Sequence, residues 1–114
     1  MTRVGEVALF TDDVPGVAAF YRELVGAPPV AEWPGGALFA IGDAKLLVHE
    51  RAGAAMDGPP NEDHFALTVD EIDTACASLT HSGVTFLVEP RDYPWGRSAY
   101  LRDPDGRLVE VAQA

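Results

Sequence analysis

An internal repeat constrains the fold of this chain more than any other feature. The segment Glu6–Val14 reads EVALFTDDV and the segment His64–Ile72 reads HFALTVDEI, so that one offset aligns His64 with Glu6. Each segment opens with the period-two alternation that is typical of a strand and then passes into a helical pattern. The sequence therefore predicts two modules with the same plan.

Each module continues with one helix that has its own start and stop signals. Asp12 or Asp13 caps the first helix and Gly26 ends it, whereas Asp70 caps the second and Gly83 ends it. The predicted apolar stripes are Val17, Phe20, Tyr21 and Leu24 in the first helix, and Ile72, Ala75, Cys76 and Leu79 in the second.

Three short strands are predicted after each helix. They lie near Pro29–Glu32, Gly36–Gly42, Lys45–Arg51, Thr85–Glu89, Arg97–Arg102 and Arg107–Ala112, with the turn Asp103–Gly106 before the last. The plan is β-α-β-β-β twice, an α+β fold in one domain over residues 1–114. The modules span about 1–52 and 63–114, and the stretch 53–62, rich in Gly, Ala and Pro, links them.

Strand alternation assigns each side chain to one of two faces. The larger aliphatic side chains are expected on the helix side, so that the helix lies on the convex side of its sheet. The residues expected to be buried there are Val7, Leu9, Phe20, Leu24, Phe65, Leu67, Leu79, Val109 and Val111.

The opposite, concave face then carries four ligand-type side chains. They are Glu6, His49, His64 and Glu110. Two histidines and two glutamates suit a borderline divalent cation, because imidazole and carboxylate are its ordinary ligands and two carboxylates balance its charge. Taken singly, each could instead be a polar rim residue, and a one-residue slip of the strand would present Glu50 in place of His49.

Composition excludes several classes of partner. The chain has 8 Lys and Arg against 18 Asp and Glu, for a net charge of −10, which argues against nucleic acid and anionic membranes. The acidity either keeps the surface soluble or favours cationic ligands. No apolar run approaches the ~20 residues of a membrane span and no signal peptide is recognisable, so we expect a cytoplasmic protein. Cys76, the single cysteine, is expected to be buried.

The motifs resemble those of one known superfamily. The segment Glu6–Val14, followed by FYRELVG at Phe20–Gly26, is similar to the opening strand and FYxxxLG helix of the vicinal oxygen chelate superfamily. The segments His64–Asp70 and Trp95–Val111 resemble its second-half signatures. That superfamily includes glyoxalase I, methylmalonyl-CoA epimerase, extradiol dioxygenases, fosfomycin-resistance enzymes and bleomycin-resistance proteins.

The resemblance implies a glyoxalase-like fold, in which paired βαβββ modules form a curved mixed-sheet cup around a divalent metal ion. By position, Glu6 falls where many members have a first-strand histidine, His64 on the second-half histidine and Glu110 on the final glutamate. His49 falls near the remaining ligand position, where bacterial glyoxalase I has a glutamate. Members form homodimers, and we expect one here.

Two functions are therefore open. The first is a metal-dependent enzyme (Zn, Ni, Mn, Co or Fe) that chelates two vicinal oxygens of a small molecule for isomerase, lyase or dioxygenase chemistry, with Glu110 or Glu6 moving the proton. The second is a metal-free binding protein of the bleomycin-resistance type that sequesters a cationic ligand. The aromatic residues expected to line the substrate cavity are Phe10, Trp33, Tyr93, Trp95 and Tyr100.

Overall fold

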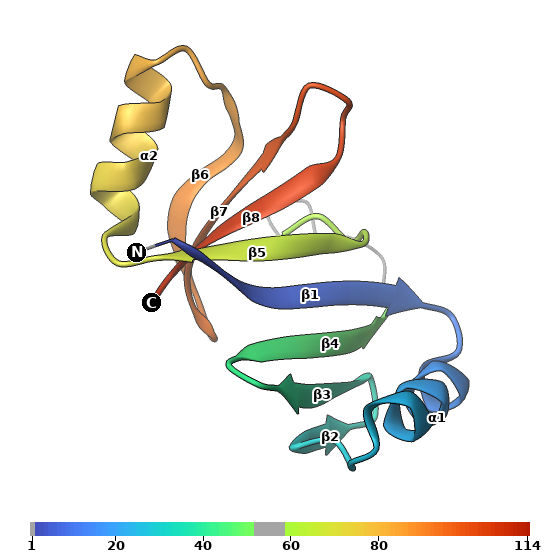
Figure 1. Cartoon of the computed structure of the whole chain (residues 1–114). Coiled ribbons are helices and arrows are strands. Elements are labelled where there is room, and N and C mark those ends of the chain that lie inside the picture. Colours follow the sequence, from blue (N-terminus) through green and yellow to red (C-terminus); the bar gives the residue numbers. More distant parts are fainter. Residues whose placement is uncertain (1, 52–58) are drawn as a thin grey trace. The chain divides into compact units, whose positions relative to one another are not determined.

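The computed structural model describes residues 2–51 and 59–114 and divides the chain into two compact units (Figure 1). One unit comprises Gly5–Asp63, and the other comprises His64–Ala114 with the residues up to Val4. The predicted linker 53–62 lies largely outside the described residues. We describe each unit as one module.

The first module follows the predicted order of elements. It consists of β1 (Arg3–Thr11), α1 (Val14–Val25), β2 (Ala31–Trp33), β3 (Gly36–Ile41) and β4 (Ala44–Glu50). Its strands lie in the order β2-β3-β4-β1. The pair β1–β4 is parallel and the other pairs are antiparallel.

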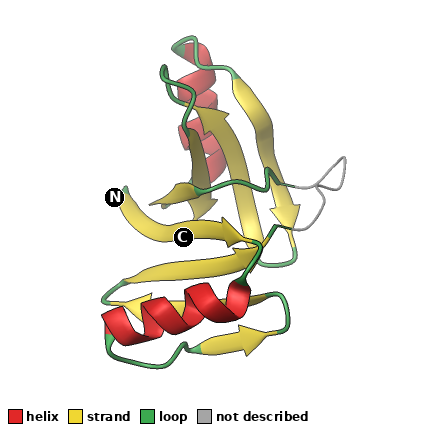
Figure 2. Ribbon diagram, turned by 90° about the vertical axis from the view of Figure 1, so that its right-hand side faces the viewer, coloured by secondary structure: helices red, strands yellow, loops and turns green. Residues whose placement is uncertain are grey.

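The second module repeats this plan. It consists of β5 (His64–Val69), α2 (Ile72–His81), β6 (Phe86–Tyr93), β7 (Gly96–Arg102) and β8 (Leu108–Gln113). Its strands lie in the order β5-β8-β7-β6, and β5–β8 is again the parallel pair. The predicted α+β fold of two βαβββ modules is thus confirmed, and each helix lies against strands of its own module (Figure 2).

The ends of α1 are those that the sequence predicts. Asp13 is the N-cap, and its carboxylate accepts a hydrogen bond from the Gly16 N–H at 3.1 Å. Gly26 follows the helix with a φ of 81°, and its N–H donates to the Arg22 carbonyl at 2.9 Å. Glycine adopts this left-handed conformation without the steric cost that a Cβ would add.

The core of the first module forms between α1 and strands β3 and β4. Phe39 and Val48 are fully buried in it. The helix contributes the residues Val14, Val17, Ala18, Tyr21 and Val25. These positions follow the i, i+3, i+4, i+7, i+11 spacing of one helix face.

The expected burial of several apolar residues is wrong. Phe20 and Leu24 are 61% and 69% exposed, because each precedes a core-facing residue of α1 by one position, a rotation of about 100° around the helix. Val7 and Phe65 are each 37% exposed. Leu9, Leu67, Leu79 and Val109 are half-buried, and Val111 alone of the nine is fully buried.

The core of the second module lies between α2 and its strands. Ile72 and Cys76 of α2 are buried against Ala99 of β7 and Val111 of β8. The burial of Cys76 confirms the prediction that it is a core residue. Burial raises the pKa of its thiol, as does the negative charge of Asp73, so the nucleophilic thiolate is disfavoured.

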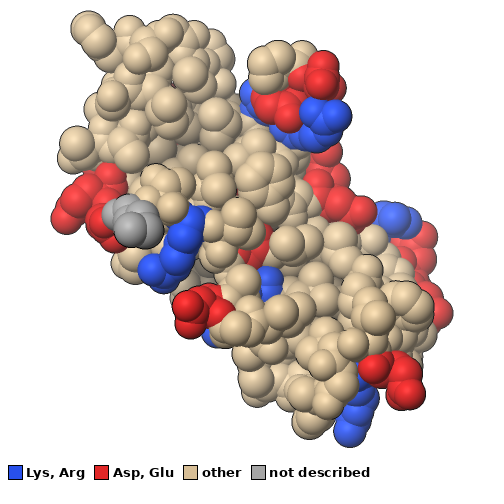
Figure 3. Space-filling view, viewed as in Figure 1, with Lys and Arg blue, Asp and Glu red and all other residues tan. Residues whose placement is uncertain are grey.

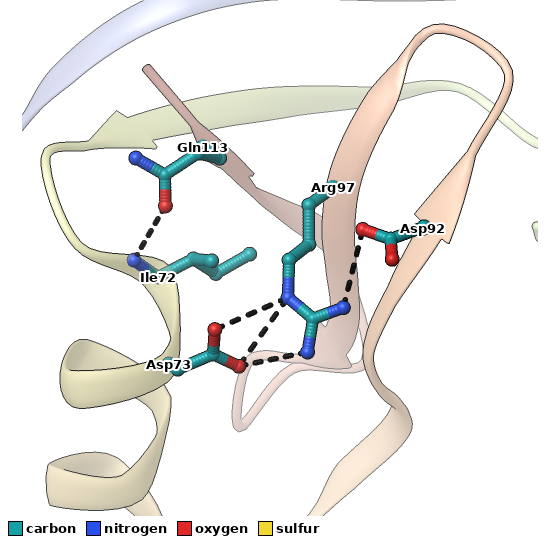
Figure 4. Close-up of polar contacts among 5 residues, drawn as sticks. All are labelled: Ile72, Asp73, Asp92, Arg97 and Gln113. Atoms are coloured by element: carbon teal, nitrogen blue, oxygen red, sulfur yellow. Dashed lines mark hydrogen bonds and ion pairs between the residues drawn. The ribbon is translucent and has the colours of Figure 1, made fainter.

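The start of α2 differs from the prediction. Glu71, not Asp70, is the N-cap, and it makes no side-chain capping bond. The Gln113 side chain of β8 takes that role, because its Oε1 accepts from the Ile72 N–H at 2.9 Å (Figure 4). Its Nε2 donates to the Asp70 carbonyl at 2.5 Å. A residue distant in sequence therefore satisfies the helix terminus.

Several arginines at the surface form ion pairs with aspartates. Arg97 of β7 bonds to Asp73 of α2 at 2.9 Å and to Asp92 of β6 at 3.2 Å (Figure 4). Both contacts raise the pKa of the Arg97 guanidinium.

On the face seen in Figure 3, acidic and basic side chains lie in mixed groups among a larger area of other residues. No helix in the described ranges has both the length and the apolar character to cross a membrane.

Replacing Gln113 tests the cap of α2. Gln113→Ala leaves the Ile72 N–H without its acceptor, so we expect the free energy of unfolding to fall by about 1–2 kcal/mol in urea titrations. Gln113→Glu keeps the acceptor for Ile72 and adds a negative charge at a helix N-terminus but loses the donor to the Asp70 carbonyl, so it should retain part of that stability. Equal losses in the two variants would contradict this role.

Candidate functional site

The second module brings His64 and Glu110 into contact. In the parallel pairing of β5 with β8, Glu110 stands opposite Ala66, two residues after His64, so both side chains lie on the face away from α2. His64 Nε2 lies 3.0 Å from Glu110 Oε1, and the two side chains are 5% and 6% exposed. An ionisable pair is thus almost completely removed from solvent.

Ser98 completes this pair, and sequence reasoning missed it. Its Oγ donates to Glu110 Oε2 at 2.7 Å, and Ser98 is 1% exposed. Each carboxylate oxygen of Glu110 therefore has its own hydrogen-bond partner. The sequence did carry one signal for it: side chains alternate between the two faces of a strand, so Ser98 of β7 shares its face with Tyr100.

An aromatic group adjoins the His64–Glu110 pair. Tyr100 is 2% exposed and stands edge-on to the His64 ring, with centroids 5.8 Å apart. Tyr93 is edge-on to Tyr100 at 6.2 Å, and Trp95 stacks on Tyr93 at 4.7 Å with the planes 3° apart. Three of the five predicted cavity residues thus lie together in the second module.

The hydroxyl of Tyr93 is in an unusual environment. Its oxygen is buried and has no hydrogen-bond partner among the described residues. Burial raises the pKa of this phenol; the positive charge of Arg91 partly opposes the rise, and the negative charge of Glu110 adds to it. Tyr93 therefore remains a protonated hydrogen-bond donor at neutral pH.

The first module gathers the other predicted residues around His49. In the strand register His49 stands opposite Phe10 on one side and Gly36 on the other, and Gly36 stands opposite Trp33. The His49 ring lies 5.5 Å from the Phe10 ring and 6.5 Å from Trp33. A Cβ on Gly36 would lie 2.5 Å from the Trp33 ring, so glycine is needed for this arrangement.

The orientation and tautomer of His49 follow from its contacts. His49 lies on the face opposite the core residues Leu46 and Val48, whereas the exposed Glu50 takes the other alternation. His49 Nδ1 lies 2.8 Å from the Glu50 carbonyl, which can only accept, so Nδ1 carries the proton. The Nε2 atom is left able to bind a metal ion or accept a proton.

Glu6 and His49 do not lie together as His64 and Glu110 do. Glu6 pairs with Lys45 and His49 with Phe10, which places them four residue pairs, or about 13 Å, apart along the strands. Leu47, opposite Ala8, holds the register position that corresponds to Glu110 in the second module. The structural repeat therefore does not place a ligand-type residue there.

The fit to a metal ion can be judged from the donor atoms. No group of three or more His, Cys, Asp or Glu within residues 2–51 and 59–114 is arranged to hold one. The 3.0 Å between His64 Nε2 and Glu110 Oε1 nevertheless equals the spacing of two adjacent ligands at about 2.1 Å from one ion with a right angle between them. This nitrogen–oxygen pair fits two ligand positions of a divalent cation.

Removing His64 should lower the free energy of unfolding, because Glu110 stays buried and loses a hydrogen-bond partner. In His64→Ala the carboxylate keeps Ser98 as its one hydrogen-bond partner within the described residues, and we expect the free energy of unfolding to drop by about 3–5 kcal/mol at pH 7. His64→Gln retains a donor and should lose clearly less. Chemical unfolding of both variants measures the difference, and equal losses would show that the contact does not stabilise Glu110.

Comparison with known proteins gives a consistent picture. The family model described as the Glyoxalase/Bleomycin resistance protein/Dioxygenase superfamily matches residues 3–111. The chain is 32% identical to the glutathione transferase FosA of Serratia marcescens, over 95% of this chain and 78% of that protein. It is 25% identical to a virulence protein of Salmonella typhimurium, over 97% of this chain and 83% of that protein.

A solved structure shows the same fold. A variant of methylmalonyl-CoA epimerase from Streptomyces coelicolor, in complex with 2-nitronate-propionyl-CoA, superposes with a TM-score of 0.78. The match covers 100% of this chain and 95% of that chain at 22% sequence identity. At this identity the likeness concerns the fold alone.

Proposed function

Because the chain belongs to the glyoxalase/bleomycin resistance protein/dioxygenase superfamily, we propose that it is an enzyme of vicinal oxygen chelate chemistry with His64 and Glu110 at its centre. The observation that carries the proposal is the chain of contacts from His64 through Glu110 to Ser98, buried on the face away from α2. Its substrate is a small molecule with two neighbouring oxygen atoms.

The burial of this pair favours a functional role over a structural one. Desolvating an imidazole and a carboxylate costs several kcal/mol, and a well-packed apolar pair is often equally or more stable. Buried ionisable groups whose partners are specific gather at catalytic and binding sites. The aromatic group of Tyr93, Trp95 and Tyr100 beside the pair provides apolar surface for a ligand.

His64 and Glu110 are the residues that we propose to hold a divalent cation. Such an ion, when bound, supplies a Lewis acid that polarises substrate oxygens. In the first module His49 keeps Nε2 available as a donor, because its Nδ1 carries the proton. Glu6 lies about 13 Å from His49 along the strands, so the two do not hold the same ion.

The reaction that the residues support best is proton transfer at a carbon beside a carbonyl. Ser98 holds Glu110 Oε2, which leaves Oε1 either as a ligand of the cation or as the acceptor of a substrate proton. Where Oε1 binds the cation, Glu6 is the other candidate for moving the proton. Proton transfer of this kind underlies isomerase, epimerase and lyase reactions. Because one relative is a glutathione transferase, the substrate panel includes glutathione with methylglyoxal and with fosfomycin.

Metal addition tests the proposal. The wild-type protein, stripped with chelator, should melt several degrees higher with excess Zn²⁺, Ni²⁺ or Mn²⁺, because an ion that binds only the folded state stabilises it. His64→Ala and Glu110→Gln should each lose most of this gain. His81→Ala, which removes the exposed histidine at the end of α2, is the matched control and should keep it.

A second candidate is a metal-free protein that binds a cationic ligand. Tyr93 and Trp95 stack at 4.7 Å, and aromatic faces of this kind attract cations. The net charge of −10 favours such ligands at long range. If no divalent ion shifts the melting temperature and a cationic glycopeptide such as bleomycin does, this candidate replaces the first.

We also propose that the chain forms a homodimer. Several large apolar side chains lie exposed, among them Phe20 and Leu24 of α1 at 61% and 69%, and association would remove them from water. Sedimentation at micromolar concentration should give twice the chain mass of 12.2 kDa. A single species of the monomer mass would contradict the proposal.

A further inference from the structure

Tyr93 and Arg91 lie on the same face of the second module as Glu110. In the pairing of β6 with β7, Arg91 stands opposite Ser98, whose hydroxyl bonds to Glu110. Tyr93 follows Arg91 by two residues and therefore shares its face. The edge-on contact between Tyr93 and Tyr100 agrees with this placement.

The hydroxyl of Tyr93 has no use within the described fold. A buried donor without a partner destabilises the folded state, and more than nine in ten such groups in proteins are satisfied. The Tyr93 ring already packs between Trp95 and Tyr100, and a phenylalanine would make the same ring contacts. The oxygen atom adds only an unsatisfied donor to the described structure.

The charges near this donor favour an anionic partner. Arg91 holds its guanidinium carbon 5.4 Å from the centre of the Tyr93 ring, in a chain whose overall charge is −10. A phenol that stays protonated donates its strongest hydrogen bonds to charged oxygens. A carboxylate near Tyr93 would receive this hydrogen bond and the electrostatic attraction of Arg91 together.

On the basis of the proposed function, we infer that Tyr93 determines specificity at this site by donating a hydrogen bond to a carboxylate group of the substrate, whose charge Arg91 balances. The substrate class is thus a small carboxylate-bearing molecule. Glu110 repels an anion placed directly against it, so the carboxylate lies on the Tyr93 side and the reacting carbon on the Glu110 side.

Trp95 is the exposed neighbour of the Tyr93 ring. This side chain covers one face of the Tyr93 ring but is itself 60% exposed, and it lies in the turn between β6 and β7. Because Trp95 lies outside both strands, its side chain can rotate without breaking a strand hydrogen bond.

The test compares Tyr93→Phe and Arg91→Gln with the wild type, using benzoate as the carboxylate probe and benzylammonium as its cationic counterpart. Tyr21→Phe, which removes a hydroxyl from α1 in the first module, is the matched control. Melting temperatures without ligand and calorimetric dissociation constants are measured for all four proteins. The Zn²⁺-induced melting shift is recorded in parallel.

We expect two effects of opposite sign in Tyr93→Phe. Its melting temperature should rise by about 2 °C or more, because an unsatisfied buried donor is removed. Its dissociation constant for benzoate should increase by about 10-fold, since a hydrogen bond to a charged group is lost. Arg91→Gln should also weaken benzoate binding, and Tyr21→Phe should change neither quantity. A purely structural hydroxyl would not give this combination.

Other results would overturn the inference. They are an unchanged benzoate affinity in Tyr93→Phe, a lower melting temperature in that variant, or tighter binding of benzylammonium than of benzoate by the wild type. The Zn²⁺ shift reports separately on the proposed function: its absence in the wild type contradicts the metal centre, and Tyr93→Phe should retain it. The two proposals can therefore fail independently.

Discussion

The parallel pairing of the first and last strand of each module is the constraint on which the rest of the structure depends. It joins β1 to β4 and β5 to β8, strands that are separated in sequence by a helix and a hairpin. Parallel strands require a crossover, and the helix of each module provides it while covering one face. The opposite face is then free of helix, and it carries the polar side chains of the candidate site.

The two modules use this common plan differently. In the second module the register brings a histidine and a glutamate into contact, and a serine from β7 satisfies the remaining carboxylate oxygen. In the first module the corresponding position is Leu47, and His49 instead lies among aromatic rings two residues further along. A structural repeat therefore preserves the backbone arrangement without preserving the chemistry on its face.

The charge beside Tyr93 is opposite in sign to the net charge of the chain. The chain is strongly acidic, yet Arg91 lies over Tyr93 on the face that carries Glu110. Long-range fields govern encounter and solubility, whereas a bound group responds to the side chains within a few ångströms. Net charge alone therefore does not decide which ligand sign a site prefers.

The sequence by itself determined the order of elements, the caps of α1 and the faces of His64 and Glu110, because turns and period-two alternation are local properties. It did not determine the rotation of α1, which packs the partly buried Tyr21 against the core and leaves Phe20 exposed. It also missed Gln113 at the start of α2 and Ser98 beside Glu110. These depend on which residues, distant in sequence, the folded sheet brings within hydrogen-bond reach, and only tertiary packing decides that.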